Sequence, residues 1–471
     1  MNASFSALHQ LMNQMQKAFE DLDVNVAPHA LESLSSTVFQ VLTARERHYH
    51  TMSFQSESSQ SSLMKDPVWV LTRTFKDAVY LQVDKRVHPL IRPALEGFVI
   101  DEQLSVSVPA FQPENMPFYL KLALRVFEVP PGKKLRFTAE ENKFLSGVVA
   151  AYFLCDLLET WDLLRVLTCM KATTPILGLS HLESDQAVVW LEKLEALQAE
   201  FNLKQTSEEL RKLMSLAVDV ANQDRMMFVS TPEGFLSQVL SLMLETHPVL
   251  RNPACSVRQM RLSFQQYFEY LSSLRSHQIF QRFGSNPHDL QYTRLKKKAD
   301  QNLEIAQQVF QSMVVSLALL ESLSMMTGGD APYLLFIGDL GVFESLMSAQ
   351  PATGEGQKRL LMSTLSGRVY ELLHQGSGRL SAGLKNSFSL GSYIHAQMSD
   401  SELHQAMVLI SQYQKGDLSA VDFLASAYPE AVLEDVLVVL SQIAGTRSQQ
   451  MRDALKEIKL RFGSQVLPQA A

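Results

Sequence analysis

Two neighbouring stretches hold most of the chemically informative residues of this 471-residue chain: RHYHTMSF at positions 47–54 and FKDAVYLQVD at positions 75–84. Histidines and Asp77 in these stretches are residue types that ligate metal ions or move protons in hydrolytic enzymes. Phe54 and Lys76 stand among them, and neither can ligate a metal at neutral pH. Phe carries no donor atom, and a protonated Lys has no lone pair to offer. The stretches therefore predict a fold more firmly than a reaction.

Apolar residues recur at steps of three and four along much of the chain, which is the period of an amphipathic helix. Strand-like alternation is confined to Leu104–Val108, beside Pro109, and predicts an extended loop or an edge segment. Thr138 and Glu141 form a capping-box pattern ahead of a helix that we expect to run toward Met170. The fold class predicted is all-α. Further helices are expected through Leu8–Leu22 and over 185–201, 206–229, 232–246, 257–280 and 290–326.

Composition argues against two classes of partner. The formal net charge is −7, so no overall basic field attracts nucleic acid or anionic lipid. The most apolar run, Phe144–Cys155, is well short of the roughly 20 residues that a membrane-spanning helix needs. Three widely spaced cysteines do not form a disulfide framework, and no secretory signal pattern is present. These features predict a soluble, cytoplasmic protein with no nucleic-acid or membrane partner.

The two stretches resemble the first motifs of the HD superfamily, an all-helical fold named after a His-Asp pair that binds a divalent metal. The first family motif reads Tyr-His-x-x-x-His; Tyr49 and His50 match it, and Phe54 stands at its last position. In a bacterial-type branch of the family the second motif reads His-Asp-x-Val-Tyr-x-Gln-Val-Asp. Positions 76–84 read KDAVYLQVD, so Lys76 replaces the His of the pair.

Later motifs extend the resemblance over roughly 30–345. Positions 142–147 read NKFLSG against Asn-Glu-Phe-Leu-Ser-Ala, and positions 171–176 read KATTPI against Glu-Ala-Thr-Ile-Pro-Phe. Positions 221–224 read ANQD against Ala-Asn-x-Asp, and positions 327–332 match the run Thr-Gly-Gly-Asp-Ala-Pro. The two glycines of that run are also the chemistry of a helix C-cap, which is the interpretation we favour over a phosphate-binding loop.

The resemblance implies a metal site held by positions Phe54, Lys76, Asp77 and Asp224, of which the first two cannot ligate. It also implies that His50 stands where related phosphodiesterases place the proton donor to the leaving oxygen. A general acid without the metal that activates water has little to do. The resemblance therefore implies a pseudoenzyme without a metal or another cofactor.

Lysine stands at positions 76, 143 and 171, where the family pattern has a neutral His or a carboxylate. Removing a divalent cation leaves buried carboxylates uncompensated, and lysine can restore neutrality by ion pairing. We expect such pairs with Asp77 or Asp224; the alternative is that the lysines simply extend to the surface. We call the following residues the vestigial pocket: His50, Phe54, Lys76, Asp77, Lys143, Lys171 and Asp224.

The function expected is non-catalytic binding through this vestigial pocket, with Arg47 and His48 as anion-binding residues. The candidate partners are a small phosphorylated ligand, a protein partner or a second copy of the chain. Two alternatives stay open. One is an active phosphohydrolase with altered coordination by His48, His50, Asp77 and Asp224. The other is a helical scaffold or oligomerisation module whose pocket is filled by side chains.

Three segments are predicted along the chain. Residues 1–345 form the HD-like helical domain, residues 346–392 a connecting segment and flexible linker, and residues 393–471 a C-terminal helical domain. The linker prediction rests on the Gly- and Ser-rich composition of residues 375–392.

Overall fold

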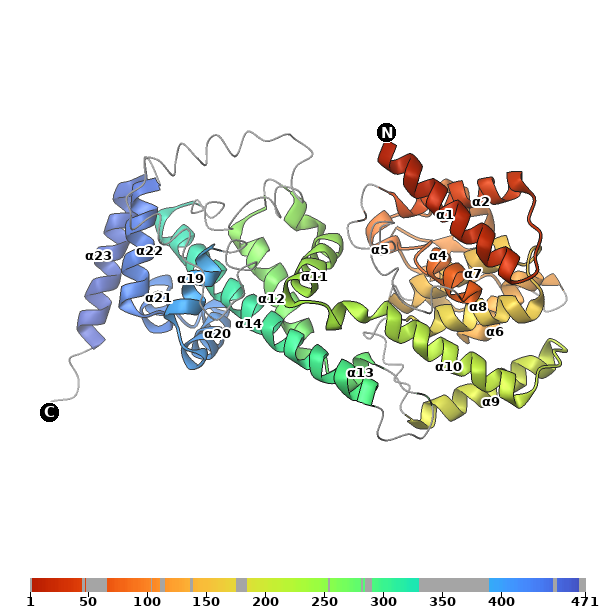
Figure 1. Cartoon of the computed structure of the whole chain (residues 1–471). Helices are drawn as coiled ribbons and strands as arrows, with labels where there is room; N and C mark the ends of the chain where they lie inside the picture. The colour runs from red at the N-terminus through yellow and green to blue at the C-terminus, as the bar shows by residue number, and fades with distance from the viewer. Residues whose placement is uncertain are drawn as a thin grey trace. The chain divides into compact units, whose positions relative to one another are not determined.

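The computed structural model describes residues 2–44, 47, 66–102, 104–110, 115–135, 139–174, 184–252, 255–280, 283, 290–329, 389–443 and 447–465. Helices make up nearly all of the regular structure in these ranges, with one small sheet (Figure 1). The all-α prediction is confirmed.

The chain divides into two compact units. Unit 1 comprises Met1–Val229 and Arg275–Asp300, and unit 2 comprises Ser230–Leu274 and Gln301–Ala471. The predicted boundary at 345 and most of the predicted linker lie outside the described residues, so that division stays a prediction. Its last residues are described, and Ser389–Gln397 form helix α19 with Leu390 buried, so the linker does not extend to 392.

Unit 1 begins with α1 (Asn2–Asp21) and α2 (Pro28–Leu42), which pack against each other (Figure 1). Leu11, Met15 and Phe19 of the predicted first stripe are buried. Further helices of unit 1 are α4 (Pro67–Phe75), α5 (Leu81–Asp84), the 3₁₀ helix η2 (Pro89–Leu95), α6 (Phe118–Phe127), α7 (Ala139–Leu154), α8 (Thr160–Ala172), α9 (Ser184–Glu200), α10 (Ser207–Asp224), the 3₁₀ helix η5 (Met226–Val229) and α13 (Ser276–Ile279).

Helix α8 lies at the centre of the core of unit 1, because it packs against α4, α6, α7 and α10. Leu163, Leu164, Val166 and Leu167 are completely buried, as expected for a helix that is apolar on most of its faces. Packing on this common helix brings elements that are far apart in the sequence into one core.

The single long helix predicted toward Met170 is wrong. Helix α7 ends at Leu154, and α8 begins at Thr160 after Glu159, whose backbone is extended. Acidic side chains favour the first turn of a helix, where backbone N–H groups are unpaired, and Asp162 lies in the first turn of α8. The residues that interrupt the apolar pattern therefore start a new helix.

The alternating segment at 104–108 is the middle strand of a three-stranded antiparallel sheet, and the prediction of a loop or edge segment is wrong. Strand β2 (Val106–Ser107) pairs with β1 (Val99–Ile100) on one side and with β3 (Lys134–Leu135) on the other. Both partners are two residues long, which is too short for alternation to be visible in the sequence.

Unit 2 contains α11 (Pro232–Thr246), the 3₁₀ helix η6 (Pro248–Arg251), α12 (Val257–Ser273), α19, α20 (Asp400–Lys415), α21 (Ala420–Ala427), α22 (Glu430–Ile443) and α23 (Ser448–Gln465). Helix α14 (Leu290–Thr327) begins in unit 1 and continues into unit 2. Its apolar part has the length and composition of a membrane span, but 72% of that window is buried inside the structure, as in the core helix of a soluble protein.

Helix α14 ends as the Thr-Gly-Gly pattern predicted. Gly328 has a φ of 69°, in the left-handed region where glycine carries no steric penalty. The Gly329 N–H donates to the Ser324 carbonyl at 3.0 Å and satisfies one carbonyl of the last turn. The C-cap interpretation is confirmed for the residues up to 329.

Replacing Gly147 with Ala tests the close packing of α7 on α6. A Cβ atom at position 147 would lie 2.7 Å from Cζ of Phe127. Alanine gains about 1 kcal/mol of helix propensity over glycine, but overpacking costs about 1–3 kcal/mol, so Gly147→Ala is expected to destabilise unit 1. Urea unfolding followed by tryptophan fluorescence measures this, because Trp69, Trp161 and Trp190 all lie in unit 1.

The matched control is the same change in a Phe127→Leu background. There the overlap is relieved, and Gly147→Ala should be neutral or stabilising. Equal effects of Gly147→Ala in both backgrounds would contradict the proposed contact.

Candidate functional site

The site is built on the segment that follows α4. Asp66 caps this helix by accepting hydrogen bonds from the N–H groups of Val68 at 2.8 Å and Trp69 at 3.3 Å. Pro67 occupies the first turn, where its missing N–H costs nothing. The helix packs against α8 and ends at Phe75. Lys76 and Asp77 therefore emerge at a buried helix end.

Four charged side chains meet there, and we call Lys76, Asp77, Lys143 and Asp224 the ion cluster. Lys76 Nζ contacts Asp224 Oδ1 closely and lies 3.2 Å from Asp77 Oδ2. Lys143 Nζ lies 2.5 Å from Asp77 Oδ1 and donates to the Lys76 carbonyl at 3.2 Å. Asp224, the last residue of α10, is 148 positions away from Lys76 in the sequence. The ion cluster thus joins the end of α4, the first turns of α7 and the end of α10.

The ion cluster is buried and electrically balanced. The side chains of Lys76, Asp77 and Lys143 are no more than 8% exposed, and that of Asp224 is 17% exposed. Two ammonium groups face two carboxylates, so the four formal charges cancel. Removing one partner would leave a buried charge uncompensated, which is costly.

Burial and charge act in opposite directions on the two lysines. Burial lowers the pKa of Lys76, but the Asp224 and Asp77 carboxylates outweigh it, and the net shift is upward. Burial also lowers the pKa of Lys143, and there the Asp77 carboxylate offsets only part of the effect. Lys76, which contacts both carboxylates, therefore has the higher pKa of the two lysines.

Arg73 adds a positive charge beside the ion cluster. Burial lowers the pKa of its guanidinium to about 10, and Asp224 opposes the shift. The group keeps its charge at neutral pH. Arg73 lies one turn before Lys76 on α4, and its guanidinium interacts electrostatically with Asp224.

One face of α7 also holds the backbone that follows Asp77. Asn142 Oδ1 accepts a hydrogen bond from Leu81 N–H at 3.1 Å. Ser146 Oγ accepts from Val79 N–H at 2.9 Å and donates to the Val79 carbonyl at 3.3 Å. Residues 79–81 are therefore fixed by two polar side chains one helical turn apart.

Arg47 holds the same segment from another direction, and it is not placed as an exposed anion-binding residue. Its Nη1 donates to the Asp77 carbonyl at 2.6 Å, and its Nε and Nη2 donate to the two carboxylate oxygens of Asp84 at 3.1 and 2.6 Å. The side chain is 0% exposed. The anion that Arg47 binds is thus an internal carboxylate, in the bidentate geometry that suits a guanidinium.

Lys171 is not part of the ion cluster, and the expected pairing with Asp77 or Asp224 is wrong for this lysine. It lies in the last turn of α8, and its Nζ contacts Glu128 Oε2 at 2.6 Å and the Val126 carbonyl at 2.9 Å. The physical reason is that Glu128, just after α6, offers a nearer carboxylate. The expected internal pairing is present for Lys76 and Lys143.

Three predicted site residues, His48, His50 and Phe54, lie outside the described residues. Among the residues that are described, no three His, Cys, Asp or Glu side chains group as a metal site would require. Asp77 and Asp224 are each engaged by an ammonium group, so neither is presented as an open ligand or base.

Sequence reasoning quoted Asn142, Ser146 and Asp84 within motifs but assigned them no role, and it missed Arg73. A signal was present for the first two, because polar residues four apart in an apolar helix predict a polar contact on one face. The contact of Arg47 with Asp84 carries no such signal, because it depends on the turn between α4 and α5.

Comparisons with protein-family models, curated proteins and solved structures find no match to this chain. The HD-like relationship remains a resemblance, carried by the motifs.

Replacing Lys76 with Met tests the importance of the ion cluster. Met keeps the apolar length of the side chain and removes the charge, which leaves Asp224 without its ammonium partner. Breaking a buried pair in this way costs about 3–5 kcal/mol. Urea unfolding monitored by tryptophan fluorescence should show that loss in unit 1.

The matched control is Lys212→Met, which removes a lysine whose partner Glu208 lies four residues away on the exposed face of α10. Exposed pairs contribute little, so this variant should unfold like the wild type. If Lys76→Met behaved like Lys212→Met, the ion cluster would have no energetic importance.

Proposed function

We propose that this chain is a non-catalytic, HD-like helical protein that acts by binding, and that the ion cluster stands in place of the family's metal centre. The observation that carries the proposal is the position of Lys76. It is aligned by the motifs with a metal-ligating histidine, and its ammonium group contacts both Asp77 and Asp224, the two remaining carboxylate positions.

Charge balance supports the replacement. Two carboxylates that face a divalent cation need a charge of +2, and the two ammonium groups of Lys76 and Lys143 supply that charge together. In the family pattern position 143 is a glutamate, so the change to lysine there acts in the same direction as the change at position 76. Both substitutions keep the buried carboxylates compensated without a metal.

The side chains present do not fit a divalent metal. A metal ion approaching Asp77 or Asp224 would have to displace an ammonium group and remain beside two positive charges. An ammonium group is no Lewis acid and cannot activate water as a metal does. The same contacts weigh against an active phosphohydrolase with altered coordination through Asp77 and Asp224.

Because the ion cluster does not suit metal-dependent catalysis, the role proposed for the protein is binding. The candidate partners are a small phosphorylated ligand at the vestigial pocket, a protein partner or a second copy of the chain. The guanidinium of Arg73 lies near Asp224 beside the two ammonium groups, and this concentration of basic side chains supports an anionic ligand. A cytoplasmic location belongs to the same proposal, and it is supported by the free thiols of Cys155, Cys169 and Cys255.

Rebuilding the metal site tests this proposal. The triple variant Phe54→His, Lys76→His and Lys143→Glu restores the family residues at three positions and removes both ammonium groups. It is expected to bind Mn²⁺ and to be stabilised by about 3–4 kcal/mol at saturating metal, seen as a metal-dependent rise in Tm. The wild type should carry no stoichiometric Mn, Fe, Zn or Mg after dialysis, as measured by elemental analysis.

The control is Lys76→Met as a single change in the wild-type chain. It removes the charge at position 76 and adds no metal-ligating atom. Its Tm should not respond to Mn²⁺. Stoichiometric metal in the wild type, or a rebuilt variant that ignores Mn²⁺, would contradict the proposed register.

A further inference from the structure

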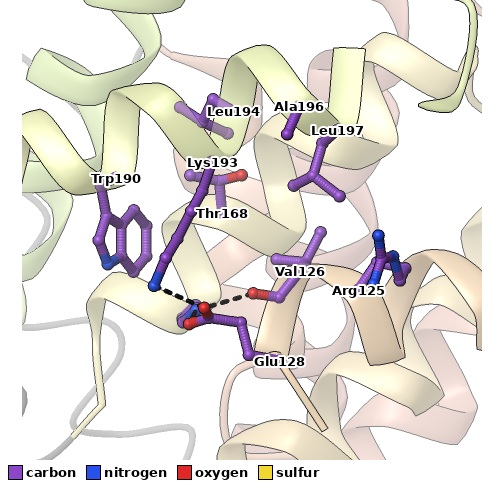
Figure 2. Close-up of a pocket in the computed structure, with 10 residues that line it drawn as sticks. Arg125, Val126, Glu128, Thr168, Trp190, Lys193, Leu194, Ala196 and Leu197 are labelled. Atoms are coloured by element: carbon purple, nitrogen blue, oxygen red, sulfur yellow. Dashed lines mark hydrogen bonds and ion pairs between the residues drawn. The ribbon is translucent and has the colours of Figure 1, made fainter. Parts of the chain in front are cut away.

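A second candidate site lies between α6, α8 and α9, all within unit 1. It is a cavity of about 150 Å³. Figure 2 shows the apolar side chains of Val126, Leu194 and Leu197 on one side and the Trp190 ring on another. Charged groups lie between them, with Lys193 reaching from α9 toward Glu128. An apolar cavity with a few convergent polar groups is the usual form of a small-molecule site.

One internal carboxylate organises the charges of this cavity. Glu128 Oε2 lies 2.6 Å from Lys171 Nζ, and Glu128 Oε1 lies 2.5 Å from Lys193 Nζ. Burial raises the pKa of Glu128, but the two ammonium groups outweigh it and lower the pKa overall. Two ammonium groups therefore converge on one carboxylate at the wall of the cavity.

A further basic residue, Arg125 of α6, lines the cavity. Arg125 pairs with Glu200 at 2.7 Å, and Lys121 shares the same carboxylate at 3.5 Å. Lys171 also lies 4.7 Å from the centre of the Trp190 ring, in a cation–π contact. The cavity therefore places two ammonium groups beside an aromatic face.

The backbone of Glu128 has a conformation that is unusual for a residue other than glycine. Its φ and ψ are 58° and 36°, in the left-handed region that glycine commonly occupies at helix ends. A residue with a Cβ atom carries a steric cost there. The side chain of Glu128 stands at a position where the backbone alone would favour glycine, which is consistent with a role for its contacts with the two lysines.

Thr168 gives an independent sign of a missing partner. It lines the cavity, is 1% exposed, and its hydroxyl has no hydrogen-bond partner within the described part of the chain. A helical threonine can donate to the carbonyl four residues earlier, as Thr74 does to Val70 at 2.8 Å. Leaving a buried hydroxyl unpaired costs free energy, so a bound acceptor at this position would be favoured.

We propose that this cavity binds a small organic anion, a carboxylate or a phosphate monoester, whose apolar body is no larger than a six-membered ring. The acidic group pairs with Lys193 and Lys171, beside or in place of Glu128. The apolar body packs on Trp190 and Leu194, and the Thr168 hydroxyl donates to an oxygen of the ligand. An apolar cavity of about 150 Å³ is large enough for benzene, which sets the size limit. This site goes beyond the binding role proposed above: it shares only Lys171 with the vestigial pocket as the sequence defined it, and Lys171 is not part of the ion cluster.

The indole N–H signal of Trp190 in tryptophan-labelled, full-length protein provides the readout, assigned through Trp190→Phe. Benzoate and phenyl phosphate are the probes, with benzyl alcohol as the neutral match and inorganic phosphate as the anion without an apolar body. At millimolar concentrations both organic anions should shift this signal saturably, and the signals of Trp69 and Trp161 should not move. Whichever of benzoate and phenyl phosphate binds more tightly shows whether the site prefers a carboxylate or a phosphate monoester.

Four variants locate the site. Lys193→Met should weaken binding by about tenfold, as expected for loss of one charge-assisted contact, whereas Lys212→Met removes the same charge elsewhere and should have no effect. Glu128→Gln removes the competing carboxylate and should tighten binding. Thr168→Val should weaken binding while the Tm stays equal or rises, because the variant no longer buries an unpaired hydroxyl.

Four results would overturn the proposal. Benzyl alcohol binding as tightly as benzoate would show a plain apolar cavity. If inorganic phosphate bound as tightly as phenyl phosphate, the apolar body of the ligand would contribute nothing to binding. If Lys193→Met and Thr168→Val both left the affinity unchanged, the anion would not bind at these residues. If neither organic anion shifted the Trp190 signal, the cavity would not bind such ligands. None of these results depends on the metal experiments, so the two proposals fail separately.

Discussion

Lys76 places one ammonium group against two carboxylates, one from the next residue and one from the end of α10. Buried charges without partners cost several kcal/mol each, so the packing of α4 and α10 on α8 is compatible with these residues only if the charges meet. Lys143 completes the balance and also binds the Lys76 carbonyl, which fixes the backbone between α4 and α5. The arrangement of the helices in this part of unit 1 depends on that neutralisation.

A metal ion and a pair of ammonium groups can supply the same charge, but they differ in chemistry. A divalent cation holds several ligands and polarises water or substrate, whereas an ammonium group donates hydrogen bonds and stops there. Under the proposed function, substitution at positions 76 and 143 converts a reactive centre into a structural one. The cavity at Glu128 shows the opposite balance, because its lysines outnumber its carboxylate and the buried Thr168 hydroxyl finds no partner among the described residues.

The sequence predicted the helices well where the apolar period is uninterrupted. The ranges 232–246 and 290–326 correspond to α11 and α14 almost residue for residue. The prediction was wrong where a helix break interrupts an apolar pattern and where strands are very short. The pattern toward Met170 hid the break before Thr160, and the partners of β2 are too short to announce a sheet.

The candidate site was predictable in part, because lysines at metal-ligand positions need carboxylates nearby. That reasoning identified the ion pairs that Lys76 and Lys143 make with aspartates, but it assigned Lys171 to the same group of residues, where it does not lie. Its true partner, Glu128, depends on a left-handed backbone at the end of α6, which no residue pattern indicated. The cavity around Trp190 was not predicted at all, since it arises from three helices that meet only in the folded chain.

The central claim is that Lys76 and Asp224 stabilise each other across α4 and α10. A double-mutant cycle measures this most directly, with wild type, Lys76→Met, Asp224→Asn and the double variant compared by urea unfolding and tryptophan fluorescence. The account predicts that the double variant loses less stability than the two single variants together, with a coupling free energy of about 1–3 kcal/mol. Losses that add to within about 0.5 kcal/mol would show that the two residues do not interact, and would contradict the account.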